Sequence, residues 1–479
     1  MVGGVRPHDM AISSVMTIRS HRSWGPLVLV AALAVAACGS SAPTTPPASR
    51  GPAPSATTQP SGPAVTSSPS VAVSPVPTPA ATAAAVSCAD TGDAAPRPTS
   101  DTGDPNAGLY AKIEAQVSAL RGLTATTPVA RSVFDVPGLC AYLKKSLAED
   151  NPPALMTATE TLYRELLLLQ PGQSLEKLYL DLLGSQVAGL YDDKTKHMYV
   201  VTSTGAIGPV EQITYAHEYT HALQDQAFDL RKLVGEAHDQ GDRSLARSAL
   251  VEGDATLLMS LWAQQNLTAA EIAKAASASD PTATAALAAA PVILKDSLMF
   301  PYTSGLNIAL GAYGSGGGFA GVDTLFANPP DSTEQVLHPD KLAAREAPVK
   351  VAFPADLAKR LGPGWTVPLQ DTLGEFQLEI LLREGGASDS KAAAAGWGGD
   401  RVALIEGPDG AVGVVLDTAW DTPAGATEFA TALDPLVAKL KASGRSAAVL
   451  VPEPGRVVLV TGSSPDVLGR VSNVLGLAQ

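Results

Sequence analysis

One twelve-residue stretch, Thr214–Asp225, constrains the fold most, because it contains H-E-x-x-H in a pattern that predicts an α-helix. Residues four apart lie on one helix face, so His217 and His221 are expected to point at one metal ion. Glu218 projects sideways, where it reaches a water on that metal. The helix also has a largely apolar face that can be buried, made of Ile213, Ala216, Thr220 and Leu223. The alternative is a surface helix with two solvated histidines, although histidine is scarce at 7 of 479 residues.

A third metal ligand must come from elsewhere in the chain, since catalytic zinc uses three protein ligands and one water. A histidine six residues after His221 would complete one known pattern, but that position is Ala227. Glu252 is the leading candidate, because it is an acid inside the apolar helix predicted over Ser244–Gln265. His238, in a predicted loop, and Asp254 are the rivals.

The predicted chemistry is hydrolysis by a water on one Zn²⁺ per chain, with Glu218 as the general base. The oxyanion needs a further donor, and two turn-rich stretches offer Tyr302 and His338. For both residues, a purely structural role is the alternative to a role as oxyanion donor. Asp254 and Asp225 are candidates for orienting a ligand histidine from behind.

The N-terminus predicts export. Arg19, His21 and Arg22 precede the apolar run Pro26–Ala37, which is too short to span a bilayer. It ends in Val-Ala-Ala-Cys38-Gly, which resembles the lipobox of bacterial lipoproteins and implies lipid on Cys38. Residues 1–37 are thus a predicted signal peptide, with an ordinary secretory signal as the alternative. Met16 is a second candidate start.

Residues 38–86 are dominated by Pro, Ser, Thr and Ala and have no periodic apolar face. They predict a disordered tether between the lipid and a folded domain. Cys88 and Cys140 remain after lipidation and predict one disulfide, or else two buried thiols. No C-x-x-C pair is present, so zinc binding by these cysteines is not expected.

The predicted fold class is α+β. With 45% hydrophobic residues the chain is long enough for one large or two ordinary domains. Residues 87–385 predict a mainly helical, zincin-like domain with a short substrate-side sheet. Two strands in residues 188–201 supply that sheet, and Met198–Thr202 is the expected substrate strand unless the pair is a plain structural hairpin. Residues 386–479 predict a small ββαββα module, with one helix over Thr422–Ala442.

The segments HEYTHALQDQAFDL and ALVEGDAT together resemble gluzincin-type zinc metallopeptidases that occur as bacterial, especially actinobacterial, lipoproteins. Similar blocks are MFPYTSG, PPDSTEQVLHPDK and AAGWGGDR, and the resemblance covers roughly residues 105–425. It implies that His217 and His221 bind zinc, that Glu218 is the base and that Glu252 is the third ligand. The chain departs from the thermolysin-like pattern, in which an Asp follows the ligand Glu by four residues. Thr256 stands there, and the nearby acid is Asp254.

The leading hypothesis is a membrane-anchored zinc metallopeptidase, more specifically an endopeptidase, that faces the extracytoplasmic or cell-wall space. Its expected partners are a peptide or protein of the cell envelope and the membrane, reached through Cys38. Nucleic acid is not an expected partner, because the net charge is −14 and no long basic run exists. The alternatives are a catalytically inactive lipoprotein of the same fold that binds peptide, envelope protein or metal, and a structural adaptor.

Overall fold

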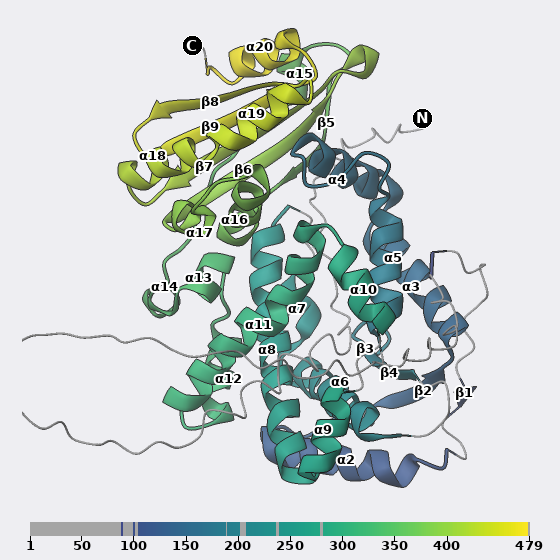
Figure 1. Cartoon of the computed structure of the whole chain (residues 1–479). Coiled ribbons are helices and arrows are strands. Elements are labelled where there is room, and N and C mark those ends of the chain that lie inside the picture. The colour runs from purple at the N-terminus through teal and green to yellow at the C-terminus, as the bar shows by residue number, and fades with distance from the viewer. Residues whose placement is uncertain are drawn as a thin grey trace, which may run out of the picture.

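The structure is a computed structural model that describes residues 88–89, 99–100, 104–187, 189–201, 207–235, 239–277 and 281–477. The predicted signal peptide, Cys38, the predicted tether and His238 lie outside the described residues. In the described part, helices form a body, and an antiparallel sheet with its own helices is stacked on one end of that body (Figure 1).

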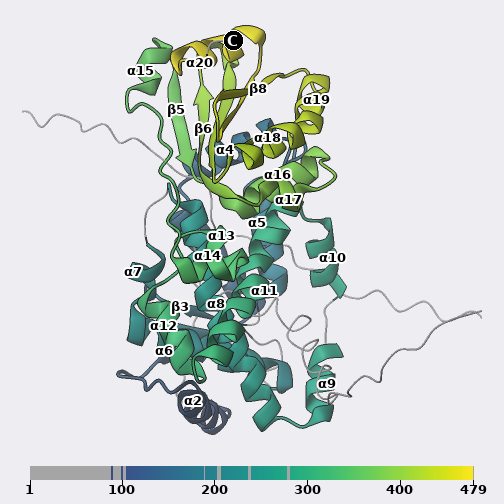
Figure 2. The ribbon, with the colours of Figure 1, turned by 90° about the vertical axis from the view of Figure 1, so that its left-hand side faces the viewer.

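The body contains helices from α2 to α14. Their bounds are α2 (Ala107–Arg121), α3 (Val136–Asp150), α4 (Pro153–Glu165), α5 (Leu175–Gln186), α6 (Pro209–Phe228), α7 (Leu230–Val234), α8 (Gly241–Asn266), α9 (Ala269–Ser277), α10 (Pro281–Ala289), α11 (Val292–Ser315), α12 (Phe319–Ala327), α13 (Thr333–Leu337) and α14 (Pro339–Ala344). The long helices α8 and α11 pack against each other along the middle of the body, and α6 crosses α8 (Figures 1 and 2).

A four-stranded sheet lies beside α6 in the order β1-β2-β4-β3. Its strands are β1 (Thr99–Ser100), β2 (Ala130–Phe134), β3 (Gly189–Asp192) and β4 (His197–Val201). β4 pairs with β2 in parallel and with β3 in antiparallel orientation, so both of its edges are occupied. The expectation that Met198–Thr202 offers an edge to substrate is therefore wrong, because β3 is the edge strand on that side of the described sheet.

The C-terminal module is built on a five-stranded antiparallel sheet in the order β5-β6-β7-β9-β8. Its strands are β5 (Thr366–Asp371), β6 (Trp397–Glu406), β7 (Val412–Trp420), β8 (Ser446–Glu453) and β9 (Arg456–Gly462), and its helices are α15 (Leu357–Leu361), α16 (Gly374–Gly385), α17 (Ser390–Ala394), α18 (Pro423–Ala432), α19 (Asp434–Ala442) and α20 (Pro465–Val474).

Two features of the module differ from the sequence expectation. The sheet includes β5, which lies before residue 386, because Thr366–Asp371 pairs with the second half of β6. The single helix expected over Thr422–Ala442 is divided into α18 and α19 at Leu433. Pro435 explains this break, because a proline is accommodated in the first turn of a new helix and not in a helix interior.

Two hydrophobic clusters organise the body. One surrounds α2, α6, α8 and α11 and contains Ile113, Val117, Leu223, Leu250, Leu258, Trp262 and Ala309. The other joins α3, α4 and α5 to the inner face of the module, through residues such as Leu143, Leu162, Leu404 and Leu416. The module thus shares a core with the body, and both sides bury apolar surface at this contact.

A disulfide joins Cys88 to Cys140 in α3. It attaches the first described residues to the body, where both cysteines are buried. None of the described helices has the length and apolar composition that a bilayer span requires.

Candidate metal centre

Helix α6 presents the two histidines of H-E-x-x-H to the interior. Pro209 occupies the first turn, and the Glu211 carboxylate accepts the Gly208 N–H at 2.9 Å, which stabilises the helix start. His217 and His221 are 0% and 1% exposed, and their Nε2 atoms are 3.0 Å apart. The i, i+4 spacing therefore directs both imidazoles to one buried point.

Helix α8 brings Glu252 to the same point. Its Oε2 lies 3.1 Å from Nε2 of His217 and 3.3 Å from Nε2 of His221. Donor atoms that share one tetrahedral zinc are about 3.3 Å apart, given bonds of about 2.0–2.1 Å. The spacing and the chemistry of this N, N, O set thus fit a zinc ion. His238, the rival ligand, lies outside the described residues.

The ionisable groups of this set stabilise one another's charge. Burial tends to raise the pKa of Glu252, but the adjacent His221 and His217 outweigh it and hold this pKa at about 2. Burial lowers the pKa of His217. Burial also tends to lower the pKa of His221, but the Glu252 carboxylate raises it to about 9. The proton on His221 thus compensates the buried Glu252 carboxylate, and a divalent cation bound here would take the place of that proton, since a histidine ligand must be neutral.

Glu218 lies on α6 beside this set and is 1% exposed. Its Oε2 accepts the backbone N–H of Tyr191 at 2.9 Å, which ties it to strand β3. β3 is the edge strand named above, so the carboxylate expected to act as a base is positioned at that edge. The sequence offered no signal for this contact, because β3 and α6 are joined by tertiary packing alone.

Tyr302 reaches the centre from α11. Its hydroxyl hydrogen-bonds the Glu252 carboxylate, and its ring centroid is 6.1 Å from that of His217. Burial raises the pKa of Tyr302 well above its usual value, and the Glu252 and Glu218 carboxylates raise it further. Tyr302 is therefore a neutral hydroxyl donor. It was expected on a turn-rich stretch but lies inside a helix, next to Pro301, which is also within α11.

Two glycines allow α11 to approach α8 closely enough for that contact. A Cβ on Gly253 would lie 2.1 Å from the Gly305 carbonyl oxygen, and one on Gly305 would lie 2.0 Å from the Ala249 carbonyl oxygen. Only glycine fits either position. Gly253 directly follows Glu252, and Gly305 is one turn after Tyr302. The glycines in VEGDAT and PYTSG could have indicated this close packing of two helices, but the sequence analysis did not use them.

His338 has a hydrogen-bond partner in the C-terminal module. It lies between α13 and α14, and its Nε2 is 2.8 Å from a carboxylate oxygen of Glu375 in α16. Helix α13 contacts α8 through Thr333 and Asp242. Asp242 precedes Glu252 by ten residues, which is about 15 Å along a helix. The contact described for His338 is with Glu375, and its role as an oxyanion donor stays a prediction.

The two acids expected behind the histidines have other neighbours. The Asp225 carboxylate accepts from the Tyr191 hydroxyl at 2.8 Å and from Lys196 Nζ at 2.6 Å, so it supports the β3–β4 sheet. The Asp254 carboxylate accepts from Gln224 Nε2 at 2.7 Å. The residue that contacts a ligand histidine is Gln224, whose Oε1 lies 2.8 Å from Nδ1 of His221. Sequence reasoning missed Gln224, although it lies one turn after His221.

Comparison with known proteins finds a family match in the C-terminal part of the chain. A family described as Domain of unknown function (DUF8575) matches residues 361–472. That range covers the C-terminal module from the end of α15 into α20 and contains none of the residues of the metal centre. No curated protein and no solved structure matches the chain.

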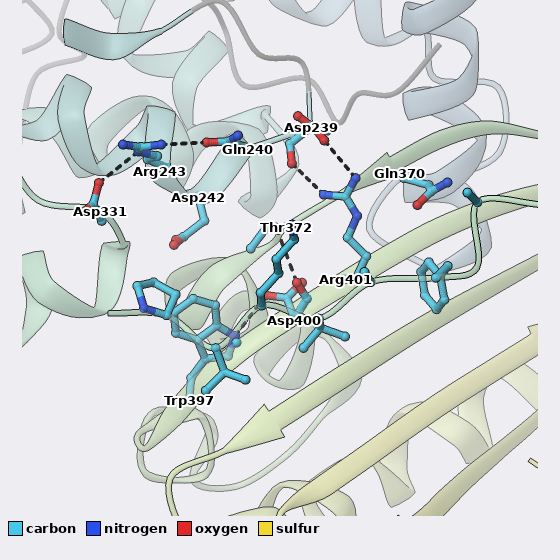
Figure 3. A pocket seen from close by; sticks show the side chains of 18 residues that line it. Asp239, Gln240, Asp242, Arg243, Asp331, Gln370, Thr372, Trp397, Asp400 and Arg401 are labelled. Carbon is cyan, nitrogen blue, oxygen red and sulfur yellow. Dashed lines mark hydrogen bonds and ion pairs between the residues drawn. The ribbon is translucent and has the colours of Figure 1, made fainter. Parts of the chain in front are cut away.

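The described residues also form a pocket of about 680 Å³ between the start of α8 and β6 (Figure 3). Arg401 donates to the Asp239 carboxylate at 3.1 Å, and Trp397 Nε1 donates to Asp400 at 3.0 Å. Arg243 points toward Asp331 (Figure 3). Two ion pairs, Arg401–Asp239 and Arg243–Asp331, thus lie on its walls, and no histidine is among the residues that line it.

Proposed function

We propose that this protein is a zinc-dependent peptidase, more specifically an endopeptidase, of the gluzincin type. The observation that carries the proposal is the buried triangle of His217, His221 and Glu252, whose donor atoms are 3.0–3.3 Å apart. Two imidazoles and one carboxylate leave the open position that a catalytic zinc needs. A purely structural zinc site would close that position with a fourth protein ligand.

The zinc ion, when bound, polarises the scissile carbonyl and makes its water acidic near neutral pH. Glu218 is suited to take the water proton and deliver it to the leaving amine, because the Tyr191 N–H holds its carboxylate beside the two histidines. Tyr302 keeps its proton, since burial and two carboxylates raise its pKa. Its hydroxyl is therefore the donor proposed for the developing oxyanion.

The proposed setting is the outer face of a bacterial membrane. It rests on the apolar run Pro26–Ala37, the lipobox-like residues around Cys38 and the tether up to residue 86. The disulfide Cys88–Cys140 agrees with an oxidising compartment. A peptide or protein of the cell envelope is the proposed substrate.

One observation favours a second candidate, a metal- or peptide-binding lipoprotein without activity. His217, Glu218, His221 and Glu252 are all at most 5% exposed. A peptide bond reaches them only if neighbouring segments move apart. The intact base Glu218 argues for catalysis, because metal binding alone does not require it.

The test uses the full chain, its zinc content and its cleavage of a broad peptide library. We expect one zinc per chain, cleavage by the parent, and loss of cleavage with zinc retained in Glu218→Gln. Glu149→Gln is the control, because Glu149 is an exposed acid on α3. A parent that binds zinc and cuts no peptide favours the binding protein. Full cleavage by Glu218→Gln contradicts the proposed mechanism.

A further inference from the structure

Gln224 touches both helices that carry the proposed ligands. From α6, its Oε1 lies 2.8 Å from Nδ1 of His221, one turn earlier on the same helix. Its Nε2 donates to the backbone carbonyl of Val251 at 3.0 Å and to the carboxylate of Asp254 at 2.7 Å. Those two residues flank Glu252 on α8. One buried amide thus connects a ligand histidine to the segment that carries the ligand carboxylate.

The hydrogen-bond partners fix the orientation of this amide. Val251 O and the Asp254 carboxylate only accept hydrogen bonds, so the NH₂ group of Gln224 must face them. The reverse orientation would set an oxygen against two acceptors at a site that is 0% exposed. The Oε1 atom is therefore the group that faces His221.

This orientation selects one form of the His221 ring. A glutamine oxygen can only accept, so Nδ1 of His221 must donate its proton to it. The neutral imidazole then has its lone pair on Nε2, the atom that lies 3.3 Å from Glu252 and 3.0 Å from His217. A hydrogen bond on the far nitrogen also fixes the plane of the ring.

Asp254 is held in turn by Arg121 of α2. The Arg121 Nε donates to the same Asp254 oxygen at 3.0 Å, and both side chains are 0% exposed. Nη2 of Arg121 pairs with Asp323 of α12 at 2.7 Å, and its guanidinium lies 4.9 Å from the ring centroid of Phe319. The guanidinium is thus the positively charged partner of the carboxyl group that accepts from Gln224.

We propose that Gln224 is a positioning residue of the metal centre: it presents Nε2 of His221 to the metal and fixes α8 around Glu252, while Arg121 acts on it through Asp254. This inference rests on the proposed zinc site. It assigns the role of histidine partner to an amide, and it places the predicted acid Asp254 one step further from the metal.

The experiment measures the zinc dissociation constant of the full chain by competition with a chelator, and the visible spectrum of the cobalt-substituted protein. Loss of a partner behind a ligand histidine weakens metal binding about 10–100-fold. We expect this loss and a changed cobalt spectrum in Gln224→Leu. Gln226→Leu is the matched control, because Gln226 lies on the same helix and contacts Thr126 and Thr127 instead.

Two further variants test the hydrogen bonds of residue 224 by changing which groups carry charge. Gln224→Glu keeps an acceptor for His221 but opposes the Asp254 carboxylate, so it also weakens zinc binding. Adding Asp254→Asn removes the negative charge that opposes the introduced carboxylate. We expect the double variant to bind zinc more tightly than Gln224→Glu alone, because two carboxylates no longer face each other in a buried site. These variants decide the question even if Gln224→Leu does not fold.

Three outcomes contradict the inference in distinguishable ways. A folded Gln224→Leu with the parent zinc affinity refutes the positioning role and leaves the zinc site intact. A double variant no better than Gln224→Glu shows that Gln224 acts by packing alone. A parent that binds no zinc overturns both this inference and the proposed function. Absence of peptide cleavage by a zinc-loaded parent affects only the proposed function.

Discussion

The described residues contain two clusters of side chains that could bind a metal ion, and the two clusters balance their negative charge in different ways. His217, His221 and Glu252 converge from α6 and α8. Glu334, Glu346 and Asp421 converge at the contact between body and module. In the second cluster the Lys341 ammonium contacts all three carboxylates, at 2.5 Å from Glu334 and 3.0 Å from Glu346.

The difference between these clusters shows why similar geometry need not mean similar function. The lysine cluster contains its own cation, which balances part of the charge of its three carboxylates, so it serves as a structural ion-pair network. The histidine cluster has two nitrogen donors beside its carboxylate. Nitrogen donors suit zinc, whereas an all-carboxylate set suits harder cations. A search by proximity alone would rank both as metal sites.

The largest expected effect comes from removing one acid from each cluster. Glu252→Ala deletes one of three proposed ligands, so zinc affinity should fall by more than the about 100-fold that loss of an outer partner can cause. Glu346→Ala should leave zinc affinity unchanged. Chelator competition measures both, and equal losses would erase the distinction between the clusters.

The second prediction breaks the histidine cluster without touching a ligand. Gly305→Ala forces α11 away from α8, because its Cβ would lie 2.0 Å from the Ala249 carbonyl oxygen. Such overpacking should cost about 3 kcal/mol of unfolding free energy and move Tyr302 away from Glu252. Gly311→Ala is the control, since nothing lies within 4 Å of its Cβ and alanine favours helices. Denaturant unfolding compares the two, and equal stability would contradict the close crossing.

The third prediction concerns pH and the lysine cluster. Burial raises the pKa of Glu334 to about 7, although Lys341 lowers it. Because the folded-state pKa lies above the unfolded value, the associated stability is present below pH 4.5 and is lost as pH rises through about 7. A rise of this size corresponds to at most about 3 kcal/mol. Thermal unfolding across this range should show the decline, and Glu334→Gln should flatten it; an unchanged slope would count against burial of the charge.

The smallest expected effect is that of Lys341→Met. Removing the ammonium leaves three carboxylates together at a partly exposed site. The cost lies between about 1 kcal/mol for an exposed pair and about 3–5 kcal/mol for a buried one, so we expect about 2 kcal/mol. The loss should shrink at low pH, where the carboxylates are protonated. A pH-independent loss would indicate that the lysine contributes by packing rather than by charge.

Periodicity and spacing in the chain were enough to predict the helix that carries His217 and His221, and an acidic helix carrying Glu252. These features are local, because an α-helix repeats every 3.6 residues and orients neighbours four apart alike. The choice of Glu252 over Asp254 followed from residue type and from a family resemblance. The convergence of all three residues depends on how α8 packs against α6.

Contacts between distant segments could not be read from the chain. Glu218 accepts a hydrogen bond from a backbone N–H of β3, Tyr302 contacts Glu252 where glycines let α11 pack closely on α8, and His338 pairs with Glu375 of α16. Asp225 and Gln224 are sequence neighbours, yet helix rotation sends one to the β3–β4 sheet and the other to His221. Local sequence determines on which face of a helix or strand a residue lies. The neighbours of that residue depend on which other element packs against this face, and that is decided by the packing of the whole core.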